Sequence, residues 1–318
     1  MSASGQLGGA PVQSLPDTGV RPQLWAYPNA GLGVVGPAID SKQLTQFWSD
    51  RMQLNPRLYV RLRSLGVLRA LRFPLRWLLP LINANRLLFA ARGDAPVSLW
   101  IGDSHSLFFN QKVTPAVLSR AENMNFIWAL GPRLMWSISQ RGFPVSLNLA
   151  ARALHVLGAK SGSVVPIIVA GEIDVRCHLA SPSSSGNGDM SFIAGYVENG
   201  RKLADSMGAQ SVIFVVPVPP GRDLDAHTKF PIVGSLVSRL EAFAALRAAL
   251  ALAVQEGVGR PKAHLLDATD ILIDSGGQLD SSLTTDGCHV NREGALLVHE
   301  HLKQLLLRLS SEDVHEPG

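Results

Sequence analysis

Five short apolar runs, separated by stretches with helical patterning, constrain the fold of this 318-residue chain more than any other feature. They occupy residues 97–101, 125–130, 163–170, 211–218 and 263–272. Runs that are apolar almost throughout are typical of parallel strands, which are buried on both faces of a sheet. Strands that alternate with helices indicate a sheet covered by helices on both sides. The sequence therefore predicts a parallel sheet of about five strands.

The intervening segments predict the helices and the division of the chain. We expect helices over residues 115–122, 134–140, 146–157, 190–207, 231–256 and 291–309. Residues 1–22, rich in Gly, Ser and Pro, are expected to be a disordered lead-in, and residues 23–95 a partly helical extension. Residues 96–310 are predicted to form a flavodoxin-like three-layer α/β/α sandwich, followed by a polar tail at residues 311–318.

Positive charge is concentrated in one segment. Eight arginines lie between Arg57 and Arg92 with no acidic residue among them, and without these eight the net charge of +4 would become −4. Leucines recur there at helical spacing. We favour a helical layer packed on the main domain, because the apolar residues exceed one face. The alternative is a basic amphipathic element that contacts an anionic membrane or a lipid-linked substrate. No nucleic-acid-binding motif accompanies the segment, so nucleic acid is not an expected partner.

Cysteine usage and hydropathy bear on the compartment. Cys177 and Cys288 are too few for a disulfide framework, so reduced thiols are expected. The N-terminal residues lack the pattern of a signal peptide, and no charge-free run of about 20 apolar residues predicts a membrane-spanning helix. We expect a cytoplasmic location, with contact to a membrane surface left open.

Residues 97–106, VSLWIGDSHS, place a serine directly after a predicted strand. In an open α/β sheet, ligands bind at the carboxyl ends of the strands. A serine on a tight turn at this edge exposes its hydroxyl and directs its own N–H at a substrate oxygen. Ser104 is therefore a candidate nucleophile, and Asp103 is expected to brace the turn that carries it.

Residues 283–291, LTTDGCHVN, bring an aspartate and a histidine together just before the last predicted helix. The spacing of Asp286 and His289 lets the carboxylate accept from one imidazole nitrogen while the other nitrogen faces the site. A serine hydroxyl is a poor nucleophile alone; a histidine takes its proton, and an aspartate fixes the histidine tautomer. With Ser104, the three residues form a candidate nucleophile, general base and orienting acid.

On these two blocks the chain resembles the SGNH (GDSL-like) hydrolase superfamily over roughly residues 97–309. The resemblance rests on GDSHS at residues 102–106 and DGCH at residues 286–289, with Gly131 and GEID at residues 171–174 between them. It implies that Ser104 is the nucleophile, His289 the base and Asp286 its partner, and that the N–H groups of Ser104 and Gly131 form the oxyanion hole. His105, where many members have leucine, resembles the GDSH variant found among enzymes that add or remove acyl groups on sugars.

Ile173 departs from the family pattern, because members have an asparagine there that donates a hydrogen bond to the oxyanion. Losing one such donor typically costs about 10²–10³ in rate. Three accounts stay open: Arg176 or His178 replaces the donor, the enzyme is slow and selective, or the site only binds. The polar run containing Glu172, Asp174, Arg176 and His178 is expected to line the active site. The alternative for this run is a structural ion pair of Arg176 with one of the two carboxylates.

The sequence thus predicts a serine-dependent esterase or acyltransferase that works through an acyl-enzyme. The expected substrate is a small-molecule or glycan ester, in particular of a carbohydrate or glycolipid, with an acyl donor as a further partner in the case of transfer. No metal or organic cofactor is expected; Cys177 and Cys288 each precede a histidine, but their spacings match no structural zinc motif. The competing interpretations are a binding protein with a degenerate site and a membrane-peripheral protein that works through residues 57–92.

Overall fold

The computed structural model describes residues 82–93, 95–111, 118–120, 125–180, 189–222, 232–257, 259–284 and 286–312. The expected lead-in, most of the predicted extension and the end of the polar tail lie outside these residues. Of the extension, residues 82–91 form a helix that packs on the main domain through Leu87 and Ala91. The division of the chain into domains therefore stays a prediction.

The described chain forms a six-stranded sheet with the order β2-β3-β1-β4-β5-β6. Five strands are parallel: β1 Val97–Gly102, β3 Phe126–Ala129, β4 Val164–Val169, β5 Ser211–Val215 and β6 Lys262–Leu266. Among these five, the first strand in sequence lies between the second and the third, which is the flavodoxin-like order. The prediction of a parallel sheet of about five strands is confirmed.

Two local predictions are wrong. A helix is predicted over residues 115–122, but Leu118–Arg120 form the short edge strand β2, which pairs antiparallel with β3. A segment of three residues is too short to show the hydrophobic periodicity of a helix or a strand. Its conformation is set by β3 and by Asn83, whose side-chain amide donates to the Leu118 carbonyl at 2.8 Å. The last predicted strand is also too long, because the chain turns after β6 into helix α10, Thr269–Leu272.

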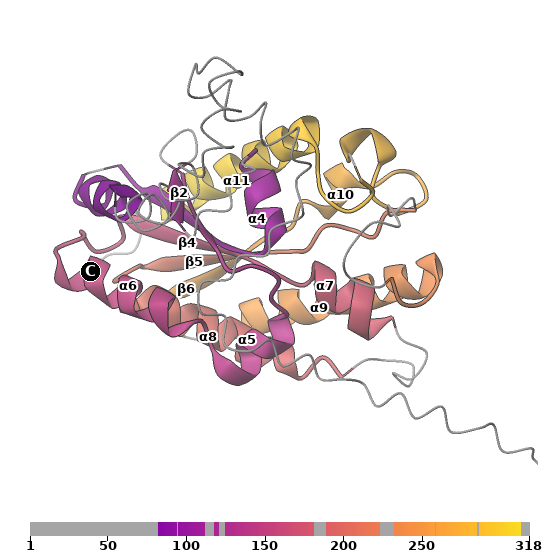
Figure 1. Ribbon diagram of the computed structural model, residues 1–318, viewed down its shortest axis with the longest axis horizontal. Helices are drawn as coiled ribbons and strands as arrows, with labels where there is room; N and C mark the ends of the chain where they lie inside the picture. The colour runs from indigo at the N-terminus through magenta and orange to yellow at the C-terminus, as the bar shows by residue number, and fades with distance from the viewer. Residues whose placement is uncertain are drawn as a thin grey trace, which may run out of the picture. The chain divides into compact units, whose positions relative to one another are not determined.

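Helices cover both faces of the sheet (Figure 1). One face carries α5 Met135–Arg141, α6 Val145–Val156, α8 Phe192–Ser206 and α9 Leu236–Glu256; the other carries α4 Ser104–Phe109, α10 and α11 Arg292–Glu312. The short helix α7, Glu172–Asp174, continues into the π-helix η1, Val175–Leu179, and the 3₁₀ turn η2 spans Ser281–Leu283. No helix within the described ranges is both long and apolar enough to cross a membrane.

Two apolar cores lie on the two faces of the sheet. Leu99 and Ile101 of β1 belong to one core, with residues of α5, α6, α8 and α9, whereas Trp100 belongs to the other, with residues of α4, α10 and α11. Successive side chains of a strand point to opposite faces, so a strand buried on both sides needs an unbroken apolar run. This is why the strand pattern is continuous, and it leaves the polar residues at the strand ends.

Candidate active site

Several polar loops meet at the carboxyl edge of the parallel sheet. Ser104 follows β1, Gly131 follows β3, Glu172 follows β4 and Gly221 follows β5. The strands on either side of β1 connect to it in opposite directions along the sheet, so the loops after β1 and β4 diverge. That divergence creates the crevice in which α/β proteins of this topology bind ligands.

Gly102 and Asp103 hold the serine at the start of α4. A Cβ atom on Gly102 would lie 2.2 Å from the Val169 carbonyl oxygen, so only glycine lets β1 and β4 approach this closely. The Asp103 side chain caps α4 by accepting from the N–H of His105 at 2.9 Å, and the Ser106 hydroxyl donates to the Asp103 carbonyl at 2.7 Å. The expectation that Asp103 braces the turn agrees with these bonds, which leave the Ser104 hydroxyl outside the cap.

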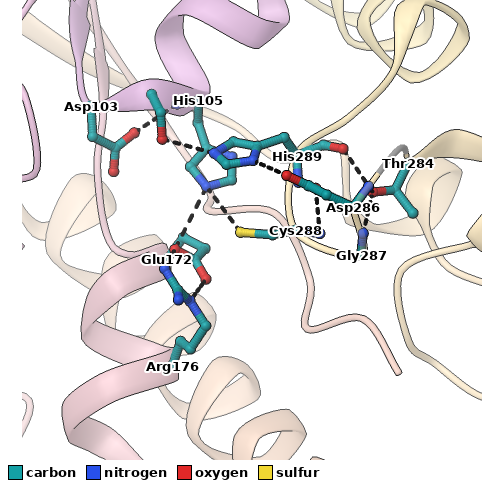
Figure 2. Close-up of polar contacts among 10 residues, drawn as sticks. Asp103, His105, Glu172, Arg176, Thr284, Asp286, Gly287, Cys288 and His289 are labelled. Carbon is teal, nitrogen blue, oxygen red and sulfur yellow. Dashed lines mark hydrogen bonds and ion pairs between the residues drawn. The ribbon is translucent and has the colours of Figure 1, made fainter. Parts of the chain in front are cut away.

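The loop that contains Asp286 and His289 is held by its own hydrogen bonds (Figure 2). The Thr284 hydroxyl donates to the His289 carbonyl at 2.7 Å and accepts from the N–H of Gly287 at 3.0 Å. Asp286 Oδ1 accepts from the N–H groups of Cys288 at 3.0 Å and His289 at 2.7 Å. These bonds fix the carboxylate while its second oxygen is turned to the imidazole.

Ser104, His289 and Asp286 lie in one hydrogen-bonded row, and Figure 2 shows the contact between His289 and Asp286. The Ser104 hydroxyl is 2.8 Å from His289 Nε2, and His289 Nδ1 is 2.7 Å from Asp286 Oδ2. With the proton on Nδ1 donated to Asp286, Nε2 is free to accept the serine proton. Burial raises the pKa of Asp286, but the hydrogen bonds and charge of His289 outweigh it and hold that pKa well below its usual range. The carboxylate therefore stays charged.

The imidazole of His289 is also packed against two rings. Phe108 stacks on it with ring centroids 4.1 Å apart, and the centroid of His105 lies 4.6 Å away. His105 is itself buried, and its Nε2 lies 3.7 Å from Glu172 Oε2 and 3.9 Å from Cys288 Sγ. His105 thus links the candidate triad to the loop after β4.

Glu172 and Arg176 form a buried ion pair at this loop. Arg176 Nε lies 2.5 Å and its NH2 nitrogen 3.0 Å from the two oxygens of Glu172. Burial raises the pKa of Glu172, but hydrogen bonds to His105 and Arg176 outweigh it and lower it to about 2. Burial lowers the pKa of His105, while the contact with Glu172 raises it, and the net direction is upward. The structural ion pair anticipated for Arg176 therefore exists, and it borders the candidate site.

Asp174 has a different position and holds a different element. Its Oδ2 accepts from the N–H of Met135 at 2.8 Å and its Oδ1 from that of Trp136 at 3.4 Å, which caps the start of α5. Burial raises the pKa of Asp174 to about 7. Because α5 begins four residues after Gly131, this contact fixes the segment that carries the expected second oxyanion donor.

The surroundings of Gly131, an expected oxyanion donor, differ from those of Ile173 and of its candidate replacements, Arg176 and His178. Gly131 has a φ of 68°, and among the described residues its N–H has no acceptor. Ile173 is buried in α7 and offers no polar atom. Arg176 is held by Glu172, and His178 lies in η1 with burial lowering its pKa; within the described ranges neither side chain is hydrogen-bonded to Ser104. Among the described residues, the structure therefore identifies no substitute for the missing asparagine.

Three potential metal ligands gather near the candidate triad. Ligand atoms of His105, Cys288 and His289 lie within 4.8 Å of one another. His289 already uses Nδ1 for Asp286 and faces Ser104 with Nε2, so a metal here would compete with the triad. Burial raises the pKa of the Cys288 thiol well above its usual value and that of Cys177 to about 11, which disfavours the thiolates that zinc requires. The expectation of no metal stays a prediction.

Two residues near this site are absent from the sequence-based prediction. Thr284 holds the loop that contains Asp286 and His289 by a hydrogen bond to the His289 carbonyl. Arg239 of α9 lies buried beside Cys288 in the wall of a cavity. A signal for Arg239 existed: the buried residues of α9 are Arg239, Phe243, Leu246, Leu250 and Val254, so the arginine lies on the apolar stripe of its helix. An arginine in phase with such a stripe is either paired or functional.

Comparisons with known proteins give structural neighbours only. No family model and no curated protein matches the sequence. The chain is similar to a carbohydrate acetylesterase from Sinorhizobium meliloti (16% identity, 67% of this chain and 99% of that one, TM-score 0.41). It is also similar to a GDSL-like lipase from Bacteroides thetaiotaomicron (15%, 71% and 98%, 0.41) and to a catalytic mutant of an acetylxylan esterase from Geobacillus stearothermophilus (12%, 67% and 94%, 0.38). These likenesses concern the fold alone, so the chemistry has to be argued from the site.

Proposed function

We propose that this protein is a serine-dependent esterase or acyltransferase whose nucleophile is Ser104. One observation carries the proposal: Ser104, His289 and Asp286 are joined by two short contacts in the order that activates a serine. The loops that hold them come from opposite ends of the described domain, 185 residues apart for Ser104 and His289. The fold alone gives no reason for these three residue types to lie together in this order at the ligand-binding edge of the sheet.

The reaction follows from the positions of the protons. His289 Nε2 takes the proton of Ser104 as its oxygen attacks the carbonyl carbon of an ester, and Asp286 stabilises the imidazolium. The N–H groups of Ser104 and Gly131 would donate to the oxyanion. His289 then protonates the departing alkoxide, which leaves an acyl group on Ser104. Water releases this group in an esterase, and the hydroxyl of an acceptor releases it in a transferase.

The substrate proposal is an ester of a carbohydrate or glycolipid. It rests on the resemblance of the GDSHS block to the GDSH variant, in which a histidine follows the serine. His105 contributes a buried polar group that contacts Glu172 and lies against the ring of His289. A peripheral membrane contact through residues 57–92 remains a separate prediction, because most of these residues lie outside the described ranges.

The proposal is tested by intact-mass analysis after treatment with a fluorophosphonate, which reacts with activated serines. We expect one adduct on the wild type and none on Ser104→Ala or His289→Ala. Ser106→Ala is the matched control: its hydroxyl lies two residues away and is committed to the Asp103 carbonyl, so this variant should keep the adduct. Circular dichroism of each variant verifies that it is folded.

Absence of an adduct on folded wild-type protein would contradict the esterase proposal. It would favour the second candidate, a binding protein with a degenerate site. The observation behind this candidate is Ile173, a buried apolar side chain in the block where the resembling family has an oxyanion donor. Retention of the adduct in Ser104→Ala would instead place the reactive serine elsewhere in the chain.

A further inference from the structure

A small cavity lies directly beside the candidate triad. Its wall contains the loop after β5 from Val218 to Gly221, the Gly287–Cys288 pair that precedes His289, and the charged side chains of Glu172, Arg176 and Arg239. Its volume of about 10 Å³ is enough for one water-sized group. A Cβ atom on Gly221 would lie 2.2 Å from the Gly287 carbonyl oxygen, so the backbones of the two loops are in contact. The cavity wall therefore cannot move without also moving the loop that contains Asp286 and His289.

Arg239 is the unusual part of this wall. The residue is 5% exposed, yet its guanidinium has only one hydrogen bond to the described residues, a long one of 3.4 Å from Nη1 to the Gly221 carbonyl. Its buried Nε has no hydrogen-bond partner there, and no carboxylate among those residues lies within ion-pair distance. Arginines this deeply buried are normally paired, because an uncompensated charge is expensive to remove from water.

The charges around the cavity do not balance. Both oxygens of Glu172 contact Arg176, and one of them also lies near His105, so no carboxylate among the described residues pairs with the guanidinium of Arg239. Burial and the positive charge of Arg176 lower the pKa of Arg239, the charge of Glu172 raises it, and the net direction is downward. Arginine nevertheless stays protonated in proteins, and its planar fork matches the two oxygens of a carboxylate. The cavity is thus an electropositive recess at the mouth of which an anionic group would be stabilised.

We propose that Arg239 binds a carboxylate of the substrate, so that the ester cleaved at Ser104 belongs to an acidic molecule such as an acylated uronic acid. The size of the cavity favours one carboxylate oxygen entering it over a bulkier tetrahedral anion. This proposal deepens the proposed function and rests on it for the reaction, but the binding of the carboxylate does not depend on catalysis. Arg239 is a specificity-determining residue in this account.

Activity measurements use two matched pairs of esters. The first pair is monoacetylated methyl glucuronoside and monoacetylated methyl glucoside, which differ only in the carboxylate. The second is 4-nitrophenyl hydrogen succinate and 4-nitrophenyl butyrate, in which the carboxylate is on the acyl side. We expect wild-type kcat/KM to favour the acid in at least one pair by tenfold or more. Arg239→Gln should abolish that preference by lowering kcat/KM for the acid at least tenfold more than for the neutral ester.

A matched control lies on the same helix. Arg247 is paired with Asp267 and Asp270, so Arg247→Gln removes an arginine of α9 without touching the cavity and should keep the preference for the acid. Two outcomes would overturn the proposal: a wild type that does not discriminate within either pair, or an Arg239→Gln variant that keeps the discrimination. Equal loss in both arginine variants would do the same.

Binding to inactive protein separates this proposal from the proposed function. By calorimetry, Ser104→Ala should bind glucuronate, acetate or succinate at least tenfold more tightly than the double variant Ser104→Ala/Arg239→Gln, and should not bind glucose. If the fluorophosphonate test fails and this difference appears, the cavity is a carboxylate site on a non-catalytic protein. Equal binding of carboxylates by the two variants, or tighter binding of inorganic phosphate than of any carboxylate, contradicts the proposal.

Discussion

The candidate triad and the charged groups next to it are built in opposite ways. In the triad, Asp286 and His289 are partly exposed, with side chains 30% and 17% accessible, and the nitrogen and oxygen atoms that face one another are all bonded. In the adjoining group of His105, Glu172, Arg176 and Arg239, which we term the buried charge cluster, every residue is at most 9% exposed. Two of its atoms, His105 Nδ1 and Arg239 Nε, are buried without a partner among the described residues.

Under the proposed function, the difference separates reaction from recognition. A nucleophile and its base have to reach a substrate, so they lie at the surface of the crevice, where water weakens electrostatic interactions. A buried charge acts in a medium of low effective dielectric, where a specific partner is worth more and a missing partner costs more. In the buried charge cluster, the effect of a substitution on stability should therefore depend on whether the residue that is removed has a partner.

The largest effect that tests this contrast is a pair of arginine substitutions. Arg176→Met leaves the Glu172 carboxylate buried without its two contacts, which should lower the free energy of unfolding by about 3–5 kcal/mol. Arg239→Met removes a charge that has no counter-charge among the described residues, so we expect stability within about 1 kcal/mol of the wild type, or higher. Urea unfolding measures both values, provided that the unfolding free energies of the variants and the wild type depend on urea concentration with the same slope. Equal destabilisation by the two variants would show that Arg239 is already neutralised.

A second test concerns pH, because burial raises the pKa of both Glu172 and Asp174, but hydrogen bonds outweigh this effect only at Glu172. The pKa of Asp174 is raised to about 7, so the folded state holds its proton more tightly than the unfolded state. Its contribution to stability is fully present below about pH 4 and is lost as the pH rises through 7, by up to about 4 kcal/mol. The pKa of Glu172 is lowered to about 2, so its contribution is present above about pH 4.5 and is lost only as the pH falls towards 2.

Asp174→Asn isolates the first of these contributions. The amide oxygen can still accept from the N–H of Met135, but the side chain no longer titrates. Relative to the wild type, the variant should gain stability steadily between pH 4 and pH 7, as measured by chemical unfolding at several pH values. A difference between the two proteins that stays constant over this range would mean that Asp174 is ionised in both states.

The sequence predicted the triad better than the buried charge cluster, for a physical reason. Ser104 is marked locally by a strand and a glycine, and Asp286 and His289 by their spacing before a helix; neither signal needs the other. Their meeting follows from the sheet order, since the loops after parallel strands share one edge. The roles of the three residues remain a proposal, but their placement together could be predicted.

Arg239 and β2 show where such prediction ends. Arg239 becomes significant only because the loop after β5 and the Gly287–Cys288 pair enclose it, which depends on contacts between distant segments. Likewise, Leu118–Arg120 adopt a strand because β3 offers an unpaired edge, not because three residues have a preference of their own. Properties that arise from tertiary neighbours leave little trace in local patterns, although the helical phase of Arg239 is one such trace.

The smallest expected effect concerns Ile173, at the boundary between the two regions. If the missing donor limits the reaction, Ile173→Asn should raise the rate of 4-nitrophenyl acetate hydrolysis by about tenfold to a hundredfold, less than the full 10²–10³ of an optimally placed donor. Ile173→Leu, which keeps the apolar character, should leave the rate unchanged. Because Ile173 is 7% exposed, an asparagine that finds no partner there would cost about 1–3 kcal/mol of stability instead. A folded Ile173→Asn variant that is slower than the wild type, or equally fast, would mean that the site stabilises the oxyanion without a donor at position 173. A residue of the buried charge cluster would then have to supply that donor, and the cluster would not serve recognition alone.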